Sequence, residues 1–184
     1  MERLKGTAAL ARFIPLAVLF TFLVLAFLYR QGMEALASVG EAAPAFRLER
    51  LGGGELALGE LHGRPVVLNF WTTWCVECHT EAPELDAFHR EYGDRVAVVG
   101  IDMREPPSVA RGFAEEYELT YPILLDRDGR VARLYRVRGV PETWVLDADG
   151  VARYHLIGPV DFARLEEVIT SLAAEHPAGA GGLL

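Results

Sequence analysis

The chain holds only two cysteines, and they form one C-x-x-C motif, Cys75-Val76-Glu77-Cys78. The motif follows a short apolar run at residues 66–71 and opens a segment with helical periodicity, which is the placement typical of a redox pair. On the first turn of a helix two such sulfur atoms can bond, and the helix N-terminus favours the thiolate of the first cysteine. We therefore expect a redox-active disulfide with Cys75 as the exposed attacking thiol and Cys78 as the resolving thiol.

Two other uses of the motif stay open, a metal site and a structural disulfide. A closed structural metal site usually needs four ligands, and the chain has no second C-x-x-C motif, although His79 could add a third ligand. The position of the motif between a strand and a helix favours redox cycling. We accordingly expect neither a metal nor a cofactor.

The elements around the motif alternate between strands and helices. Residues 45–49 and 55–58 alternate in polarity around Gly52-Gly53-Gly54, which predicts a hairpin. Residues 66–71 are nearly all apolar, as in a strand buried on both faces. Apolar side chains at helical spacing then predict a helix that ends at Gly93. Further strands are expected at 96–101, 123–125, 143–146 and 153–157, and further helices at 109–117, 131–135 and 161–174. The pattern predicts an α/β fold with helices on both faces of the sheet.

The N-terminal segment has the features of a membrane anchor. Residues 13–29 carry no charge, and as a helix they would span about 26 Å, close to the thickness of a bilayer core. Basic residues precede this run, so the positive-inside rule places residues 1–12 in the cytoplasm and the rest outside. A cleaved signal peptide is the alternative, because Ala35-Leu36-Ala37 fits a processing site.

This reading divides the chain into five parts. The cytoplasmic N-terminus (1–12) and the single transmembrane anchor (13–29) lead into a linker (30–43). A folded domain (44–175) and a flexible tail (176–184) follow. Either reading of the N-terminus places the domain on the extracytoplasmic side of a bacterial cytoplasmic membrane, where disulfides persist.

Composition excludes several classes of protein. Apolar residues make up 51% and charged residues 24% of the chain, which is typical of a globular fold and not of a disordered or coiled-coil chain. The formal net charge is -8, although the anchor region is basic, so the domain is acidic. An acidic domain repels a phosphate backbone, and we expect no nucleic-acid binding.

Three stretches carry a resemblance to a known family. They are residues 67–78, Glu81-Ala82-Pro83 and residues 139–147, and the hairpin region opening at Ala43-Pro44 fits as well. Together they closely resemble the TlpA/ResA/CcmG group of membrane-anchored thioredoxin-like proteins, over about residues 40–174. The resemblance implies a thioredoxin-like fold with an N-terminal β-hairpin extension. It also implies a protein-disulfide reductase that faces the periplasm or cell exterior, often with apocytochrome c as client. Electrons would come from a membrane thiol transporter of the DsbD/CcdA type.

The resemblance extends to proton handling beside the pair. Ordinary thioredoxins have a buried Asp in the strand before the motif, where this chain has Asn69, which cannot take a proton. Glu81, three residues after Cys78 on the same helix face, matches a glutamate that ResA-like proteins use for this purpose. Burial would raise its pKa into the working range, whereas a solvated helix glutamate is the plainer reading.

Four further residues are expected to contact the client. Pro141 matches the cis-proline opposite the motif, and Val140 would present its backbone to the client strand. Glu142 is similar to a CcmG-like glutamate, with an exposed strand-end residue as the alternative. Trp74, with Trp71, is expected to wall the client groove, although core aromatics look the same in sequence.

Some positions depart from the family pattern and keep other functions open. Glu77 opposes formation of the Cys75 thiolate, and His79 stands where Lys or Arg is common, so any help from its charge depends on pH. A copper metallochaperone using Cys75, Cys78 and His79 is one alternative, and a general periplasmic disulfide reductase is another. A peroxiredoxin would need proline where this chain has Leu68.

Overall fold

The computed structural model describes residues 18–23 and 36–175 of the chain. Residues 18–23 are helical, while the rest of the expected anchor (13–29), the N-terminus (1–12) and the tail (176–184) lie outside the described residues. Within the described ranges, no helix is both long and apolar enough to cross a bilayer. Residues 36–175 form one compact unit.

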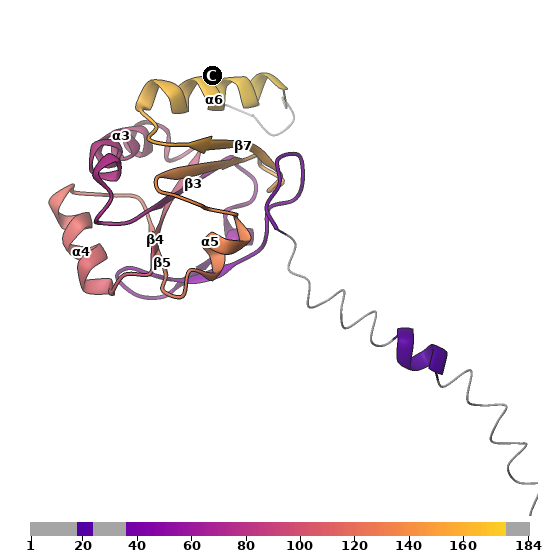
Figure 1. Ribbon diagram of the computed structural model, residues 1–184. Coiled ribbons are helices and arrows are strands. Elements are labelled where there is room, and N and C mark those ends of the chain that lie inside the picture. The colour runs from indigo at the N-terminus through magenta and orange to yellow at the C-terminus, as the bar shows by residue number, and fades with distance from the viewer. Residues whose placement is uncertain (1–17, 24–35, 176–184) are drawn as a thin grey trace, which may run out of the picture. The chain divides into compact units, whose positions relative to one another are not determined.

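A seven-stranded sheet, in the order β2-β1-β5-β4-β3-β6-β7, forms the centre of this unit (Figure 1). Strand β3, inside the sheet, pairs in parallel with β4 and antiparallel with β6, while β1 and β2 form the expected hairpin at one edge. The strands are β1 (Arg47–Arg50), β2 (Glu55–Ala57), β3 (Val66–Trp71), β4 (Ala97–Met103), β5 (Ile123–Asp126), β6 (Glu142–Leu146) and β7 (Ala152–Ile157).

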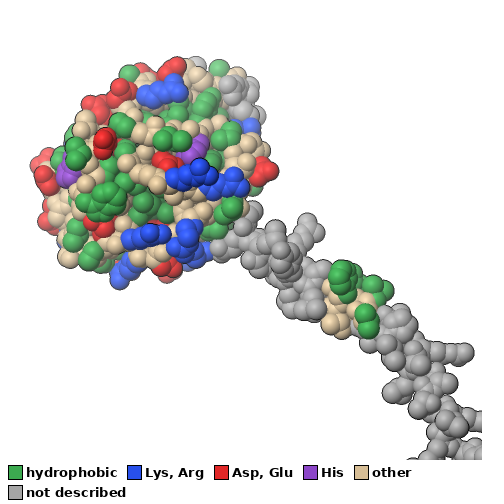
Figure 2. Space-filling model, viewed as in Figure 1, with side chains coloured by type: hydrophobic (Ala, Val, Ile, Leu, Met, Phe, Trp, Pro, Cys, Tyr) green, Lys and Arg blue, Asp and Glu red, His purple; other side chains and the backbone are tan. Residues whose placement is uncertain are grey.

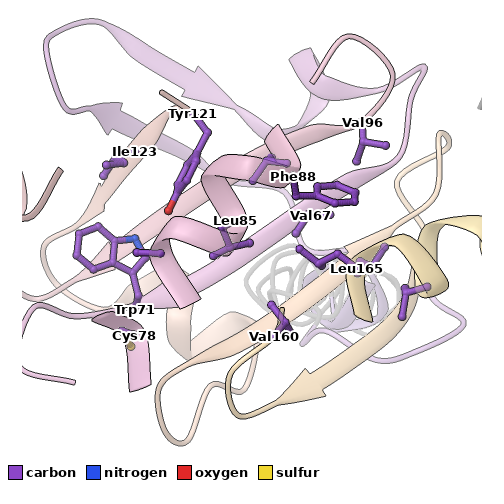
Figure 3. Packing of buried hydrophobic residues seen from close by; sticks show 14 of the residues in the cluster. Val67, Trp71, Cys78, Leu85, Phe88, Val96, Tyr121, Ile123, Val160 and Leu165 are labelled. Carbon is purple, nitrogen blue, oxygen red and sulfur yellow. The ribbon is translucent and has the colours of Figure 1, made fainter. Parts of the chain in front are cut away.

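Helices cover both faces of the sheet, as the alternating pattern predicts. Side chains of α3, α4 and α6 belong to one buried apolar cluster, and side chains of η1 and α5 belong to another. Figure 3 shows Leu85 and Phe88 of α3 packed over Val67 of β3. The helices are η1 (Leu58–Leu61), α3 (Val76–Tyr92), α4 (Pro107–Glu116), α5 (Arg130–Leu134) and α6 (Phe162–Glu175).

The folded domain begins earlier than residue 44. Ala37 N–H donates to the carbonyl of Leu134, and Ala37 is only 1% exposed. Ala42 forms a bridge with Val151, and Ala43 N–H donates to Gly150. Residues 37–43, expected to be linker, therefore pack on the domain, because their small side chains let the backbone pair closely with it.

The buried, interior position of β3 explains where the C-x-x-C motif lies. All six side chains of β3 are buried, so the strand is fixed by neighbours on both faces. It ends at Trp71, and α3 starts five residues later with Cys75 as its N-cap. The motif is thus held between the most buried strand of the sheet and a long helix.

Candidate functional site

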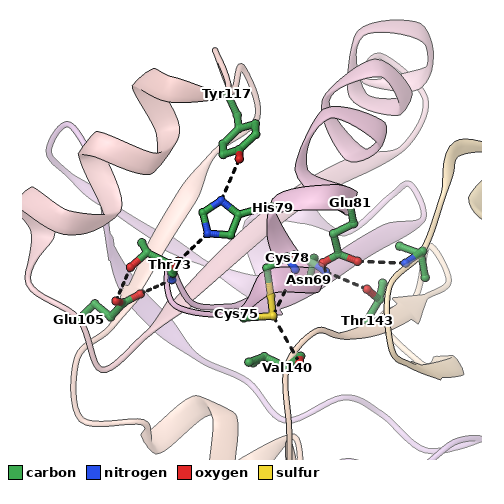
Figure 4. Close-up of a disulfide and its surroundings, with 11 residues drawn as sticks. Asn69, Thr73, Cys75, Cys78, His79, Glu81, Glu105, Tyr117, Val140 and Thr143 are labelled. Atoms are coloured by element: carbon green, nitrogen blue, oxygen red, sulfur yellow. Dashed lines mark hydrogen bonds between the residues drawn. A yellow bond between two sulfur atoms is a disulfide. The ribbon is translucent and has the colours of Figure 1, made fainter.

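Cys75 and Cys78 form a disulfide at the N-terminus of α3 (Figure 4). Their Cα atoms are 5.3 Å apart. The Cys75 sulfur accepts a hydrogen bond from the backbone N–H of Cys78 at 3.2 Å. The same N–H would stabilise a thiolate on Cys75 after reduction, which supports its assignment as the attacking sulfur.

The expectation that Cys75 is exposed is wrong for the oxidised form. Cys75 is 4% exposed and Cys78 is 2% exposed. The Cys75 sulfur lies 3.5 Å from the carbonyl oxygen of Val140, on a loop distant in sequence, and that loop covers it. The Val140–Pro141 peptide bond is cis, as the family pattern predicts. This loop therefore limits access to the Cys75 sulfur in the oxidised form.

The two tryptophans near the motif have different roles. Trp74 is 71% exposed beside the disulfide, and Val76 is 75% exposed on the other side of Cys75. Trp71 is buried and stacks on Phe113 with ring centroids 4.5 Å apart. Trp71 is thus a core residue and not a groove wall, because it closes the gap between β3 and α4. Trp74 and Val76 are thus exposed apolar side chains on either side of Cys75 in the chain.

Glu81 is buried beneath the disulfide and has two donors. Asn69 Nδ2 donates to Oε1 at 2.7 Å, and Val160 N–H donates to Oε2 at 3.0 Å. Burial raises the pKa of Glu81 to about 7 in spite of these two hydrogen bonds, which act to lower it. Asn69 also donates to Thr143 Oγ1, so strand β3 fixes the carboxyl in place. The solvated-helix reading of Glu81 is wrong: this side chain can take up and release a proton near neutral pH.

His79 is committed to contacts that leave neither ring nitrogen available. Nε2 lies 2.7 Å from the carbonyl oxygen of Thr73, and Nδ1 lies 2.8 Å from the hydroxyl of Tyr117. Because a carbonyl oxygen only accepts, Nε2–H donates to Thr73, and Nδ1 is hydrogen-bonded to the Tyr117 hydroxyl. As a copper ligand, His79 would have to abandon one of these bonds. No group of three metal-ligating side chains occurs among the described residues.

Two carboxylates near the motif were not predicted from the sequence. Glu105 accepts from Thr73 N–H at 2.6 Å and from Thr73 Oγ1 at 2.7 Å, which anchors the loop that leads to Cys75. Asp102, at the end of β4, is 1% exposed and neither of its carboxylate oxygens has a hydrogen-bond partner among the described residues. Burial and the neighbouring Glu105 raise the pKa of Asp102 to about 8. The sequence signal for both carboxylates is their place at or just after the end of β4, the strand parallel and adjacent to β3.

Glu142 is buried, so the strand-end reading with an exposed side chain is wrong. Its Oε1 accepts from the N–H groups of Arg138 and Gly139, and its Oε2 lies 2.7 Å from Nε2 of His155. Both oxygens thus face internal partners and hold the loop before the cis-proline. Glu142 therefore presents no free carboxylate at the surface.

The fold and the pair define the class of protein. A C-x-x-C disulfide at the N-terminus of a helix, opposite a cis-proline and above a buried carboxyl, is the site of a thioredoxin-fold thiol-disulfide oxidoreductase. Residues 39–155 match the AhpC/TSA family, and the chain belongs to that family.

Similar proteins support the same activity within this family. The chain is 37% identical to the thioredoxin-like protein YneN of Bacillus subtilis over 131 residues, which cover 70% of this chain and 76% of YneN. It is 32% identical to the thiol-disulfide oxidoreductase ResA of Oceanobacillus iheyensis over 143 residues, covering 75% of this chain and 74% of ResA. The ResA likeness predicted from the motifs is thus confirmed.

A solved structure extends the likeness to the fold. It is a secreted Mycobacterium tuberculosis disulfide oxidoreductase homologous to Escherichia coli DsbE, which superposes with a TM-score of 0.61 at 31% identity. The match covers 70% of this chain and 95% of that one. The activity of this chain is therefore thiol-disulfide exchange through Cys75 and Cys78.

Proposed function

We propose that the protein is a membrane-anchored reductant of disulfides in extracytoplasmic client proteins. Apocytochrome c is the client we favour, and a membrane thiol transporter of the DsbD/CcdA type is the electron donor. The observation that carries the direction of the chemistry is the buried Glu81, with a pKa of about 7, beneath a pair that has no cationic side chain bonded to it among the described residues.

The proposed reaction uses Cys75, Cys78 and Glu81. In the dithiol form, the Cys75 thiolate attacks one sulfur of the client disulfide, and the other client sulfur leaves as a thiolate that takes a proton. Cys78 then loses its proton, for which Glu81 is the nearby acceptor, and attacks the Cys75 sulfur of the mixed disulfide. The Cys75–Cys78 disulfide forms and the second client sulfur leaves. The client gains two electrons, which the donor returns to this protein.

Acidic surroundings support the role of reductant. Glu77 and Glu81 lie on the first turns of α3, and Glu105 holds the loop before Cys75. Negative charge near the pair disfavours the thiolate, so the dithiol is less stabilised and gives up its electrons more readily. The proposed anchor rests on the uncharged run at residues 13–29 and the basic residues before it.

A trapping experiment tests clients and location together. Cys78→Ala leaves Cys75 able to attack but removes the resolving thiol, so mixed disulfides with clients should accumulate in intact cells. The Cys75→Ala/Cys78→Ala protein is the matched control and should trap nothing. We expect trapped proteins with paired cysteines, in the membrane fraction, and degraded by protease added outside the cytoplasmic membrane. Trapped cytoplasmic proteins, or protection from that protease, would contradict the proposed location.

A further inference from the structure

A cleft of about 550 Å³ adjoins the loop that carries the cis-proline. Gly139 and Glu142, on either side of Val140–Pro141, line it, and residues 37–39 form part of its wall. It therefore borders the loop whose Val140 carbonyl oxygen lies 3.5 Å from the Cys75 sulfur. We infer that this cleft binds an acidic segment of the client polypeptide close to the client's reactive cysteine, an inference that rests on the proposed function.

The charge of the cleft favours an acidic occupant. Arg136 and Arg138 line it with exposed side chains, and within the described part of the chain their guanidinium groups have no hydrogen bond or ion pair. Two other arginines of the domain are engaged in ion pairs, Arg127 with Glu49 and Arg153 with Asp147. Figure 2 shows several basic side chains close together on one part of the face viewed, although acidic residues outnumber basic ones by 26 to 18 in the chain.

Glu142 and His155, which both line the cleft, already contact each other. Glu142 is 3% exposed. Its Oε1 accepts from the N–H groups of Arg138 and Gly139, and its Oε2 lies 2.7 Å from Nε2 of His155. His155 in turn stacks on Trp144, with ring centroids 4.1 Å apart and planes 10° from parallel. An incoming carboxylate would therefore meet the two free guanidinium groups and not the buried oxygens of Glu142.

The backbone at Arg136 also points to a role for its side chain. Val137 N–H donates to Ala132 and Arg136 N–H donates to Arg133, the two bonds that close α5 in the manner of a Schellman motif. The residue at the position of Arg136 in this motif is usually glycine, because φ is positive there, and Arg136 has φ of 55°. The chain thus keeps an arginine where the backbone alone would favour glycine.

Apolar side chains beside the arginines suit an extended polypeptide. Ile157 is 80% exposed and Val39 is 55% exposed, and both line the cleft. An extended segment can bury apolar atoms against them while an acidic side chain reaches the arginines. A lipid headgroup is also anionic, but the cleft opens onto the cis-proline loop, which favours the client.

The test uses synthetic peptides that contain one disulfide and differ only by Asp or Asn at single positions within a few residues of each cysteine. The full-length protein in detergent reduces them, and KM and kcat are measured separately. We expect Asp on one side of the cysteine to lower KM several-fold relative to Asn, with kcat unchanged, and added salt to remove the difference.

Matched variants separate the cleft from folding and from the redox chemistry. Arg136→Gly with Arg138→Gln should abolish the preference for Asp while leaving the Asn peptides unaffected, and Arg111→Gln, an exposed arginine on α4, should change nothing. Arg136→Gly alone should melt no lower than wild type, because glycine suits its φ.

Three outcomes would overturn the inference. One is equal KM values for Asp and Asn peptides at every position, and another is a double variant that weakens both peptide types equally. In the third, wild type shows no preference for Asp but binds short-chain phosphatidylglycerol, and the double variant loses this binding. That result would assign the cleft to a lipid. Failure of wild type to reduce any peptide would instead contradict the proposed function.

Discussion

Replacing Glu81 by Gln should remove a pH dependence from the stability of the oxidised protein. The folded state raises the pKa of Glu81 from 4.5 to about 7 because burial disfavours the carboxylate. Between those values the unfolded chain binds fewer protons at this residue than the folded protein does. The free energy of unfolding therefore falls as pH rises through this window, and the loss is complete above about 7.

The pKa difference sets the size of the effect at about 3 kcal/mol. Gln resembles the protonated carboxyl, except that its NH₂ group cannot accept from Val160 or Asn69. That defect costs ~1 kcal/mol at every pH. The variant should thus be slightly less stable than wild type at about pH 5, and should gain about 3 kcal/mol relative to wild type by about pH 8.5.

Urea unfolding of both oxidised proteins across this pH range measures the difference directly. Other titrating groups, Asp102 among them, contribute to both proteins and cancel. Glu91→Gln, an exposed position on the same helix, is the control and should show no relative change with pH. If the free energies of unfolding of Glu81→Gln and wild type differ by the same amount from low to high pH, Glu81 does not hold its proton in the folded state, and the reasoning fails.

Three other predictions concern the neighbourhood of the pair. In the reduced protein, Cys75 should be alkylated before Cys78, because the Cys78 N–H favours a thiolate on Cys75; mass spectrometry that finds Cys78 modified first would reverse their roles. Asp102→Asn should gain stability relative to wild type as pH rises from 3.8 to about 8, the ordinary and the raised pKa of Asp102, and a constant difference across that range in urea melts would refute the burial argument. Glu105→Ala should lower the free energy of unfolding by ~1–3 kcal/mol, since both donors of Thr73 lose their acceptor; an unchanged urea midpoint would show that water replaces it.

The helices and strands were predicted well from the sequence, because the composition and periodicity that indicate each of them lie within that segment. The composition of residues 66–71 predicts a fully buried strand, and Glu81 was identified by its spacing after Cys78 together with the resemblance to ResA-like proteins. The observed β4 and α4 differ from the expected ranges by only a few residues. The site as a sequence motif was therefore accessible without the structure.

Contacts between distant segments were not predictable in this way. The burial of Cys75 depends on Val140, 65 residues later in the chain. The burial of Glu142 depends on His155 of the neighbouring strand and on the loop before it. Trp71 and Trp74 look alike in sequence, and only the packing of Phe113 distinguishes them. Each of these features is set by the register and packing of elements that no local pattern encodes.

The reduction potential of the Cys75–Cys78 pair tests the central claim most directly. Equilibrating the protein with a redox buffer of known potential, and trapping the free thiols by alkylation, gives the fraction oxidised. Because nearby carboxylates disfavour the thiolate, the reduction potential of the pair should lie close to that of thioredoxin, at roughly -270 mV. A value close to that of the strong oxidant DsbA, at roughly -120 mV, would mean that the pair accepts electrons from clients, and would contradict the account.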